Sequence, residues 1–226
     1  MTIHKQTLSF VLLICFTLPA AAQWRMGAYI GTAHNHYSAD VHYMTDVQYG
    51  DRWAFGTVGI TGQYDVLDWL GVRADVNWMR KNYTTKRSLM DTYYRTHNDY
   101  VQLPLMVTFN FGAPRVRGFL NLGVYGGYWF GSKSTGKYTI APGYEMEESW
   151  KNDFHSERDA RLDFGLTGGL GVEWRFHLLG EEWAWQVLEA RCYYSLTSTT
   201  KDYMRMKDPH YNTTLTLQSG ITYFFK

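Results

Sequence analysis

The feature that most constrains this chain is an alternation of apolar and polar residues with a period of two. In the stretch LDFGLTGGLGVEWRF, every second residue from Leu162 to Phe176 is apolar or glycine. The positions between them carry Asp163, Glu173 and Arg175, together with glycine and threonine. This pattern is typical of a β-strand with one face in an apolar environment and the other in a polar one.

The glycines of this stretch fit two other structures less well. A phosphate-binding glycine loop is followed by a helix and has a suitably placed Lys, Ser or Thr, and this context is missing here. The spacing of Gly165 and Gly169 matches the small-residue motif of membrane helices, but the acidic residues and Arg175 interrupt any apolar run of about twenty residues. A strand therefore remains the best interpretation.

The same alternation occurs in seven other segments, and no long helical pattern follows residue 22. The eight expected strands cover residues 24–33, 53–64, 70–82, 100–111, 119–130, 162–176, 188–196 and 215–225. In residues 70–82 the division is sharpest, because Val72, Ala74 and Val76 alternate with Arg73 and Asp75. Eight is an even number, as expected for an antiparallel barrel that closes on itself.

The connections between these strands alternate in length. Residues 65–69, 112–116 and 177–182 are short turns, whereas residues 34–52, 83–97, 131–161 and 198–211 form long loops. Short turns at one end and long loops at the other are typical of outer-membrane barrels. Because hydrocarbon cannot satisfy backbone amides, a spanning sheet must close and leave no edge. We therefore predict an all-β fold, an eight-stranded antiparallel up-and-down transmembrane β-barrel.

The N-terminus predicts export. Lys5 precedes an apolar run and then three alanines, so we expect residues 1–22 to be a cleaved signal peptide and residues 23–226 to be the barrel domain in the outer membrane. Without Lys5 the mature chain has 21 basic residues and 21 acidic residues, which argues against nucleic acid as a partner. Cys192 would be its only cysteine, so no internal disulfide is expected.

The aromatic residues should gather at both rims of such a barrel. At the rim of the short turns we expect Trp24, Trp69, Phe111, Trp174, Phe176, Tyr223 and Phe225. At the opposite rim we expect Trp78, Tyr128, Phe130, Phe164 and Tyr194. Two aromatic girdles at the membrane interfaces are typical of these proteins.

The polar faces of the strands place charged residues inside the barrel. The expected network consists of Arg25, Arg73, Asp75, Glu173, Arg175, Glu189 and Arg191. An eight-stranded barrel is only wide enough to be filled by side chains, and an isolated charge there is costly, so we predict paired charges that plug the interior. Gly165, Gly169 and Gly171 would make room beside Tyr125, Trp129 and Tyr193. The alternative is an ion pathway through the same charges.

The segment YVQLPLMVTFNF, the turn GAPRVRG and the segment FLNLGVYGGYWF resemble the outer-membrane β-barrel domain of Bacteroidetes proteins, the porin-family group that includes PorT-like proteins. The pattern of a Tyr followed by Pro-Leu is Tyr100, Pro104 and Leu105 here. This resemblance implies fold and location, and the family has no common catalytic residues to transfer. It also implies a role in membrane integrity, surface contact or secretion.

Three alternatives compete with this interpretation: a metal site, a lipid A-modifying enzyme and a narrow channel. His34, His36 and His42 with Asp40 or Asp46 are a weak candidate for a metal such as zinc. A lipid A-modifying enzyme would need a lipid-facing Ser and His near the outer rim. Ser219 is expected in the lower half of its strand and His177 in a short turn, so neither is at that rim. The candidates that stay open lie in the long loops and are His97, His155 and His210. A narrow channel for small solutes is the main alternative to a structural or interactive role. We expect no catalytic, metal or cofactor site.

The expected function is structural or interactive. Outer-membrane lipid and lipopolysaccharide should surround the barrel, and the barrel-assembly machinery should insert it. We place a possible protein partner at the extracellular loops, because long loops on a rigid scaffold commonly carry binding sites. Residues 131–161 are expected to form a hydrated loop in which Tyr138, Tyr144 and Trp150 anchor the partner.

Overall fold

The structure is a computed structural model that describes residues 23–39, 47–87, 92–141, 144–202 and 209–225. The expected signal peptide, residues 1–22, lies outside these ranges, as do His42, Asp40 and Asp46 of the first long loop. Among the described residues, no helix has the length and apolar character needed to cross a membrane.

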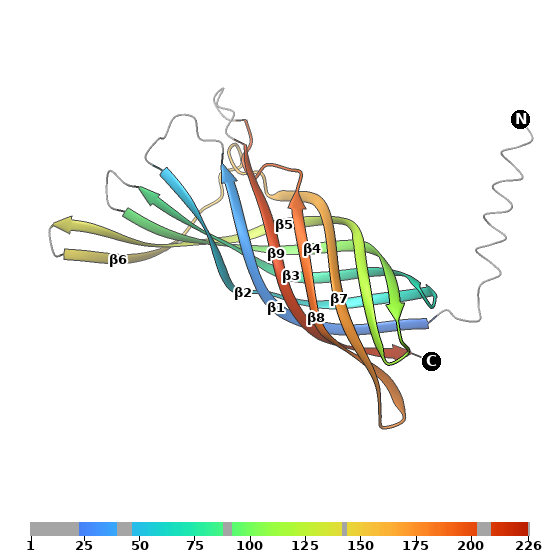
Figure 1. Cartoon of the computed structure of the whole chain (residues 1–226). Coiled ribbons are helices and arrows are strands. Elements are labelled where there is room, and N and C mark those ends of the chain that lie inside the picture. The colour runs from blue at the N-terminus through green and yellow to red at the C-terminus, as the bar shows by residue number, and fades with distance from the viewer. Residues whose placement is uncertain (1–22, 40–46, 88–91, 142–143, 203–208, 226) are drawn as a thin grey trace, which may run out of the picture.

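The described chain is built from β-strands joined by turns and loops (Figure 1). The strands are β1 (Gln23–Ala39), β2 (Val47–Leu67), β3 (Leu70–Arg87), β4 (Thr92–Gly112), β5 (Val116–Ala141), β6 (Tyr144–Lys151), β7 (Leu162–Leu178), β8 (Glu181–Ser195) and β9 (His210–Phe225). All eight predicted strands are present, and β6 is an additional one.

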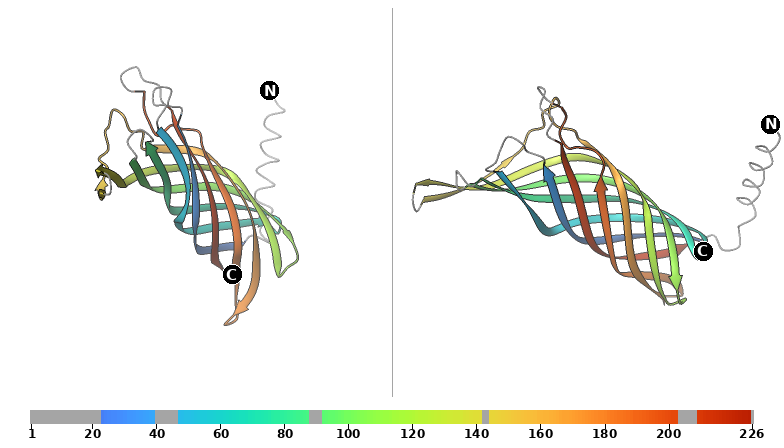
Figure 2. Two further views of the ribbon diagram at one scale, coloured as in Figure 1. Left: turned by 60° about the vertical axis from the view of Figure 1, so that its left-hand side comes forward. Right: turned by 45° about the horizontal axis from the view of Figure 1, so that its top comes forward.

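Eight of these strands close into a ring in the described part of the chain (Figure 2). The order around the ring is β1, β2, β3, β4, β5, β7, β8 and β9, with every neighbouring pair antiparallel. β9 returns to β1, with which it pairs from Trp24↔Phe225 to Ala39↔His210. The predicted eight-stranded up-and-down barrel is thus confirmed, and β6 lies outside the ring because it pairs with β5.

The alternation in the sequence separates the two faces of the ring. On β4, Leu103 and Leu105 are exposed on the outside, whereas Gln102 and Met106 are buried inside. The outer face carries large apolar side chains on every strand of the ring, among them Ile60, Val72, Leu122, Leu170 and Leu217. Such a continuous apolar surface is unusual on a protein surrounded by water and is what acyl chains would cover.

The predicted aromatic girdles lie on this outer face. Trp24, Trp69, Phe111, Trp174 and Phe225 are exposed towards the end of the short turns. Towards the opposite end, Tyr128, Phe130, Phe164 and Tyr194 are exposed, and Phe55 adds a ring 6.3 Å from Trp78.

The three short turns occur where they were predicted. β2 and β3 are joined by Asp68 and Trp69, and β4 and β5 by the residues between Gly112 and Val116. β7 and β8 are joined by a two-residue turn, in which Leu179 has φ 55° and Gly180 has φ 84°. Both chain ends that the structure describes, Gln23 and Phe225, lie at this end of the barrel (Figure 1).

The long loops are shorter than predicted, because the strands continue far beyond the apolar band. In particular, residues 131–161 were expected to be a loop, but residues 131–141 complete β5 and Tyr144–Lys151 form β6. β4 and β5 stay paired up to Tyr93↔Lys137, and β5 and β6 pair from Lys133↔Lys151 to Ala141↔Tyr144. Backbone hydrogen bonds to neighbouring strands hold these residues, although they lack a regular alternation of apolar and polar side chains.

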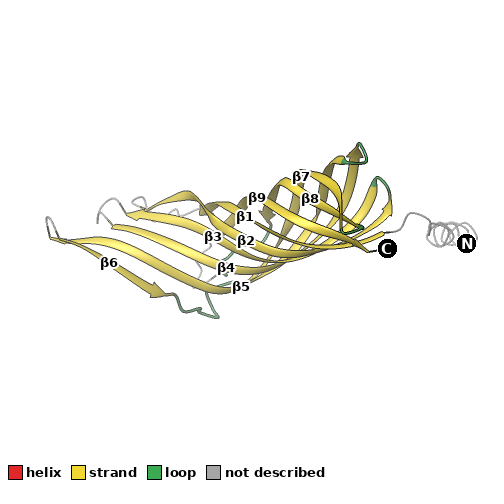
Figure 3. Cartoon of the chain, turned by 90° about the horizontal axis from the view of Figure 1, so that it is seen from below, coloured by secondary structure: helices red, strands yellow, loops and turns green. Residues whose placement is uncertain are grey.

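The upper parts of β2, β3, β4, β5 and β6 form what we call the extension sheet, residues 47–53, 81–87, 92–99, 131–141 and 144–151 (Figure 3). The strands of the extension sheet leave the ring because two of the ring's strand pairings end before the strands do. The β1–β2 pairing ends at Asn35↔Arg52, and the β5–β7 pairing ends at Tyr128↔Leu162. Beyond Asn35, β1 remains with β9. The mouth of the barrel therefore opens between the extension sheet and the β1–β9 pair.

Candidate functional site

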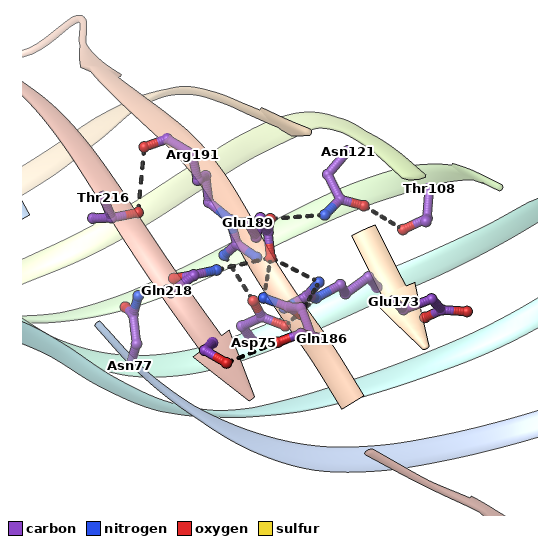
Figure 4. Close-up of polar contacts among 12 residues, drawn as sticks. Asp75, Asn77, Thr108, Asn121, Glu173, Gln186, Glu189, Arg191, Thr216 and Gln218 are labelled. Carbon is purple, nitrogen blue, oxygen red and sulfur yellow. Dashed lines mark hydrogen bonds and ion pairs between the residues drawn. The ribbon is translucent and has the colours of Figure 1, made fainter. Parts of the chain in front are cut away.

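The centre of the barrel holds a cluster of four charged side chains from β3 and β8 (Figure 4). Arg73 Nε donates to Asp75 Oδ1 at 2.9 Å, and its Nη1 lies 3.2 Å from Glu189 Oε2. Arg191 Nε donates to Glu189 Oε1 at 2.8 Å, and its Nη1 donates to Asp75 Oδ2 at 2.8 Å. Because β3 and β8 lie on opposite sides of the ring, the Arg73–Glu189 and Arg191–Asp75 pairs cross the interior, whereas the other two pairs each join residues of one strand.

Amide side chains add further hydrogen bonds to Glu189 in this central cluster. Gln186 and Gln218 donate to Glu189 Oε2 at 2.9 Å and 2.8 Å, and Asn121 donates to Glu189 Oε1 at 2.9 Å. Thr108 in turn donates to the amide oxygen of Asn121 at 2.7 Å. The carboxylate thus accepts from side chains of four strands, β3, β5, β8 and β9, and its buried charge is compensated on all sides.

A second cluster lies towards the short turns. Arg25 Nη1 donates to Glu173 Oε2 at 2.8 Å and its Nε lies 3.2 Å from Asp65 Oδ2. Arg175 Nε donates to Glu173 Oε1 at 3.0 Å, and at the rim its Nη1 lies 3.6 Å from Glu182. Both guanidinium groups also lie over the ring of Phe224, at 5.4 Å and 4.6 Å from its centroid.

A third cluster lies above the centre and was missed in the sequence. Lys81 Nζ donates to Asp163 Oδ2 at 2.6 Å, and the hydroxyls of Ser195 and Tyr125 donate to Asp163 Oδ1 at 2.6 Å and 3.2 Å. Lys81 also lies 4.7 Å from the ring centroid of Tyr100. Asp163 is on the polar face of the alternation, but 82 residues separate it from Lys81, so no local pattern links the two.

The structure places all seven predicted interior residues within these clusters, and adds Asp65, Lys81 and Asp163. Each cluster has equal numbers of cationic and carboxylate side chains if the rim residue Glu182 is set aside. Between the first two clusters lies a cavity of about 10 Å³, lined among others by Arg25, Arg73 and Glu173. That volume is about one water molecule, so the arrangement fills the interior.

The glycines of β7 make room for these side chains, and of the three predicted neighbours Tyr125 lies among the nearest atoms, whereas Tyr193 pairs with Thr167. A Cβ at Gly165 would lie 2.7 Å from Tyr125 Cε1, and one at Gly169 would lie 2.9 Å from Glu189 Oε1. Gly171 accommodates the ring of Phe119. Trp129 is not among these neighbours, because it lies nearer the mouth, where it stacks on Tyr100 at 5.9 Å.

A ring of eight antiparallel strands with an apolar outside and an ion-paired inside is the architecture of an outer-membrane barrel. The outer membrane protein beta-barrel domain family matches residues 17–201, most of the chain. This protein belongs to that family.

Solved structures of other outer-membrane barrels are similar to this family member. OprG from Pseudomonas aeruginosa is 13% identical, with 91% of this chain and 96% of that chain covered at a TM-score of 0.52. Ail, the attachment invasion locus protein of Yersinia pestis, is 15% identical, with 89% and 98% covered at a TM-score of 0.40. The outer membrane protease OmpT from Escherichia coli is 10% identical, with 90% and 96% covered at a TM-score of 0.43.

At these identities the comparison indicates the fold alone. The comparison with OprG, which has a TM-score of 0.52, supports this fold. No curated protein matches the chain. In barrels of the outer membrane the short turns face the periplasm and the longer loops face outward. By this general rule we expect the extension sheet, which lies at the end opposite the short turns, on the extracellular side.

The three expected anchor residues of the partner site do not form one cluster. Tyr144 is exposed and is the first residue of β6, the strand that lies away from the ring in Figure 1. Trp150 is half-buried at the other end of β6, with its ring 5.5 Å from Tyr94. Tyr138 lies on β5, with its backbone opposite Met146, and its side chain lies outside the described part.

The histidines considered for chemistry have other partners. His36 Nδ1 lies 2.9 Å from Asp51 Oδ1, and His34 packs 4.9 Å from the ring of Trp53. His97 Nδ1 lies 2.7 Å from Asn82 Oδ1, and His210 Nδ1 lies 2.6 Å from the hydroxyl of Tyr37. Within the described ranges, no group of three His, Cys, Asp or Glu residues is arranged to hold a metal ion.

The remaining candidates for covalent chemistry are similarly occupied. Ser219 Oγ accepts from Trp185 Nε1 at 3.1 Å and donates to the backbone oxygen of Gln186 at 2.9 Å, on the membrane-facing side. Cys192 is exposed on the apolar outer face, between its register partners Gly168 of β7 and Leu215 of β9. A thiol in apolar surroundings behaves as a small hydrophobic group.

Proposed function

We propose that this protein is a non-conducting outer-membrane barrel that anchors an extracellular sheet for contacts at the cell surface. Its role is structural or interactive rather than catalytic. The observation that carries the proposal is the central cluster, in which Arg73, Asp75, Glu189 and Arg191 are between 0% and 4% exposed. A solute would have to break several charge-assisted hydrogen bonds at once to pass it.

The outer mouth supports the second half of the proposal. The extension sheet continues the rigid hydrogen-bonded ladder of the barrel beyond the apolar band, so it holds polar and aromatic side chains in fixed positions outside the membrane. Binding residues are commonly placed on segments that a rigid scaffold positions. A closed barrel that bears such a sheet is suited to contact rather than to transport.

Recording in planar lipid bilayers tests this proposal against the narrow channel. We expect the purified protein to produce no stepwise conductance. A variant with Arg73→Ser, Asp75→Ser, Glu189→Ser and Arg191→Ser removes the central cluster without changing the net charge, and it should conduct if it still inserts. Stepwise openings of the unaltered protein that disappear on replacing Arg73 and Arg191 would support the channel and refute the plug.

We also infer that residues 1–22 are cleaved off during export. We infer as well that the chain is functionally related to the PorT-like proteins of Bacteroidetes. The support is the apolar run of the N-terminus and the Tyr100, Pro104 and Leu105 pattern. Sequencing the N-terminus of protein purified from outer membranes tests the cleavage. A mature chain that begins with Gln23 or Trp24 agrees with the proposal, and a retained Met1 contradicts it.

A further inference from the structure

A cavity of about 620 Å³ lies at the extracellular mouth of the barrel, and we call it the mouth cavity. Its lining includes Tyr37, Tyr49, Tyr83, Asn152, Asp159 and His210. It exists because the ring parts after Asn35↔Arg52 and after Tyr128↔Leu162, which leaves space between the extension sheet and the β1–β9 pair. Its volume is in the range of small-molecule binding sites, about 300–1,000 Å³.

One wall of the mouth cavity is aromatic. Tyr37 and Tyr83 are stacked with centroids 4.2 Å apart and planes at 7°, and Tyr49 lies 5.3 Å from Tyr37. The rings of Tyr49 and Tyr83 are half-buried, as is that of Trp150, so each shows part of its surface to the cavity. Aromatic faces of this kind offer large, rigid contact areas to a ligand.

Hydrogen bonds position polar side chains of the mouth cavity before any ligand binds. The hydroxyl of Tyr37 lies 2.6 Å from His210 Nδ1 and 3.5 Å from Thr199 Oγ1. Opposite, Asn152 Nδ2 donates to the hydroxyls of Ser132 and Ser134, each at 2.8 Å. A ligand would therefore meet positioned hydroxyl, amide and imidazole groups without reordering them, which lowers the entropic cost of binding.

The charges that line the mouth cavity are balanced. The lining contains two cationic residues, Lys151 and Arg158, and two acidic residues, Asp153 and Asp159, and Arg158 Nε donates to Asp159 Oδ1 at 2.8 Å. Burial tends to raise the pKa of Asp159, but hydrogen bonds from Arg158 and from the backbone N–H of His155 outweigh it and hold the pKa below its usual value. The carboxylate therefore stays ionised and paired. A strongly anionic or cationic ligand would meet a like charge as readily as an opposite one.

We infer that the mouth cavity binds a neutral saccharide. A sugar ring has apolar C–H faces that pack on aromatic rings and a rim of hydroxyls that both donate and accept hydrogen bonds, which matches the aromatic wall and the amide, hydroxyl and carboxylate groups facing it. The inference deepens the proposed surface-contact function and rests on it. The saccharide could be part of the cell's own lipopolysaccharide or a glycan from outside, because both present the same chemistry.

Binding to an array of neutral and acidic oligosaccharides, with the protein in lipid nanodiscs, tests this inference. The best neutral hit is then titrated by calorimetry, both as a free oligosaccharide and as lipopolysaccharide that carries it. Preference for one of the two forms identifies the source. Conductance recordings need no saccharide, so failure of the closed-barrel proposal is distinguishable from failure of this one.

Matched variants locate the site. We expect Tyr49→Ala and Tyr83→Ala each to weaken saccharide binding by about tenfold or more, as central aromatic contacts commonly do. Tyr49→Phe keeps the ring and should retain most of the affinity. Tyr211→Ala is the control, since Tyr211 is an exposed tyrosine beside His210 on β9 but outside the lining of the cavity. Heat-dependent gel migration verifies that each variant is folded.

Each outcome of these binding experiments either supports or overturns the inference. Saturable binding of a neutral oligosaccharide that the two alanine variants weaken and Tyr211→Ala leaves unchanged supports the inference. Absence of any neutral hit, binding of acidic glycans alone, or equal binding by all variants overturns it.

Discussion

At the scale of single residues, Glu189 makes the largest contribution that we expect to the stability of the barrel interior. Arginine, glutamine and asparagine side chains donate to its two oxygens, and the residue is 0% exposed. Two of the donors are the guanidinium groups of Arg73 and Arg191, so the carboxylate holds together two cations that would otherwise repel. Loss of its charge leaves these cations with Asp75 as their remaining carboxylate in the central cluster.

We therefore predict that Glu189→Gln lowers the free energy of unfolding by about 3–5 kcal/mol, the typical cost of breaking a buried ion pair. Urea titration in lipid vesicles, followed by tryptophan fluorescence, measures it. Glu182→Gln is the matched control, because the half-buried Glu182 lies at the rim, 3.6 Å from Arg175, and ion pairs near the protein surface contribute about 0–1 kcal/mol. Equal effects of the two substitutions would contradict the importance of the central cluster.

The sequence predicts which residues face inward, but not which of them meet. The alternation identified seven charged interior positions, because each lies on the polar face of a strand. It missed Lys81, which pairs with Asp163 across the interior. Partners across the lumen depend on the stagger of all eight strands, which is a property of the closed ring and leaves no local trace in the sequence.

At the scale of elements, the turn between β7 and β8 combines two residues with positive φ, Leu179 at 55° and Gly180 at 84°. The flanking residues Leu178 and Glu181 pair with each other, so the connection is a two-residue hairpin. Hairpins of this kind favour Asn-Gly, since Asn tolerates the left-handed region better than a larger apolar residue. Leucine at the first position is thus a local conflict between sequence and conformation.

We predict that Leu179→Asn stabilises the barrel slightly, by about 0.5–1 kcal/mol, and that Gly180→Ala destabilises it by about 1 kcal/mol. No atom lies within 4 Å of a Cβ built on Gly180, so the second effect would come from φ rather than from a clash. Thermal unfolding in vesicles measures both. Destabilisation by Leu179→Asn would show that the conformation of this turn costs little.

The loop after β6 is held by Asp159, which accepts the backbone N–H of His155 at 2.8 Å and two bonds from Arg158. Its pKa lies below the usual value, so its contribution is fully present above the unfolded pKa and is lost as the pH falls through the lowered folded value. We predict that pepsin cleaves residues 152–161 faster as the pH falls through that range. Because pepsin's own activity varies over this range, the cleavage rate is expressed relative to that of an unstructured peptide in the same solution. On that scale Asp159→Asn should remove the pH dependence, and a dependence that persists in Asp159→Asn would refute the prediction.

Most elements could be predicted from the sequence, whereas their outer ends could not. Inside the membrane the apolar face and the polar face differ, so the period of two is visible. Beyond the girdle both faces of a strand meet water, and segments such as Ser132–Lys137 of β5 lose the apolar half of the pattern while the hydrogen-bonded ladder continues. For this reason residues 131–141 and 144–151 were expected to belong to a loop although they are strands.

At the scale of the whole molecule, the barrel and the extension sheet are built differently. The barrel is closed, with neutral ion-paired clusters inside and apolar side chains outside, whereas the extension sheet ends at β6, which pairs with β5. The sequence predicts the closed part through its strand count and its alternating connections. The mouth cavity could not be predicted, because it depends on where neighbouring strands part.

We predict that replacing residues 138–146 by a two-residue turn leaves the barrel intact, because this segment makes no pairing with the ring outside β5 among the described strands. Unfolding of the shortened protein should match that of the full chain within error, as followed by heat-dependent gel migration. A clear loss of stability would mean that the tip of the β5–β6 hairpin supports the barrel.

The central claim is that the alternation separates a lipid-facing surface from a sealed, ion-paired interior. NMR of the methyl-labelled protein in nanodiscs tests it through cross-relaxation with protons of the lipid acyl chains. The account predicts lipid contacts for the exposed methyl groups of Val72, Leu105 and Leu217, and none for those of Met79 and Met106, which are 0% and 2% exposed. Lipid contacts at Met79 or Met106, or none at the three outward residues, would contradict it.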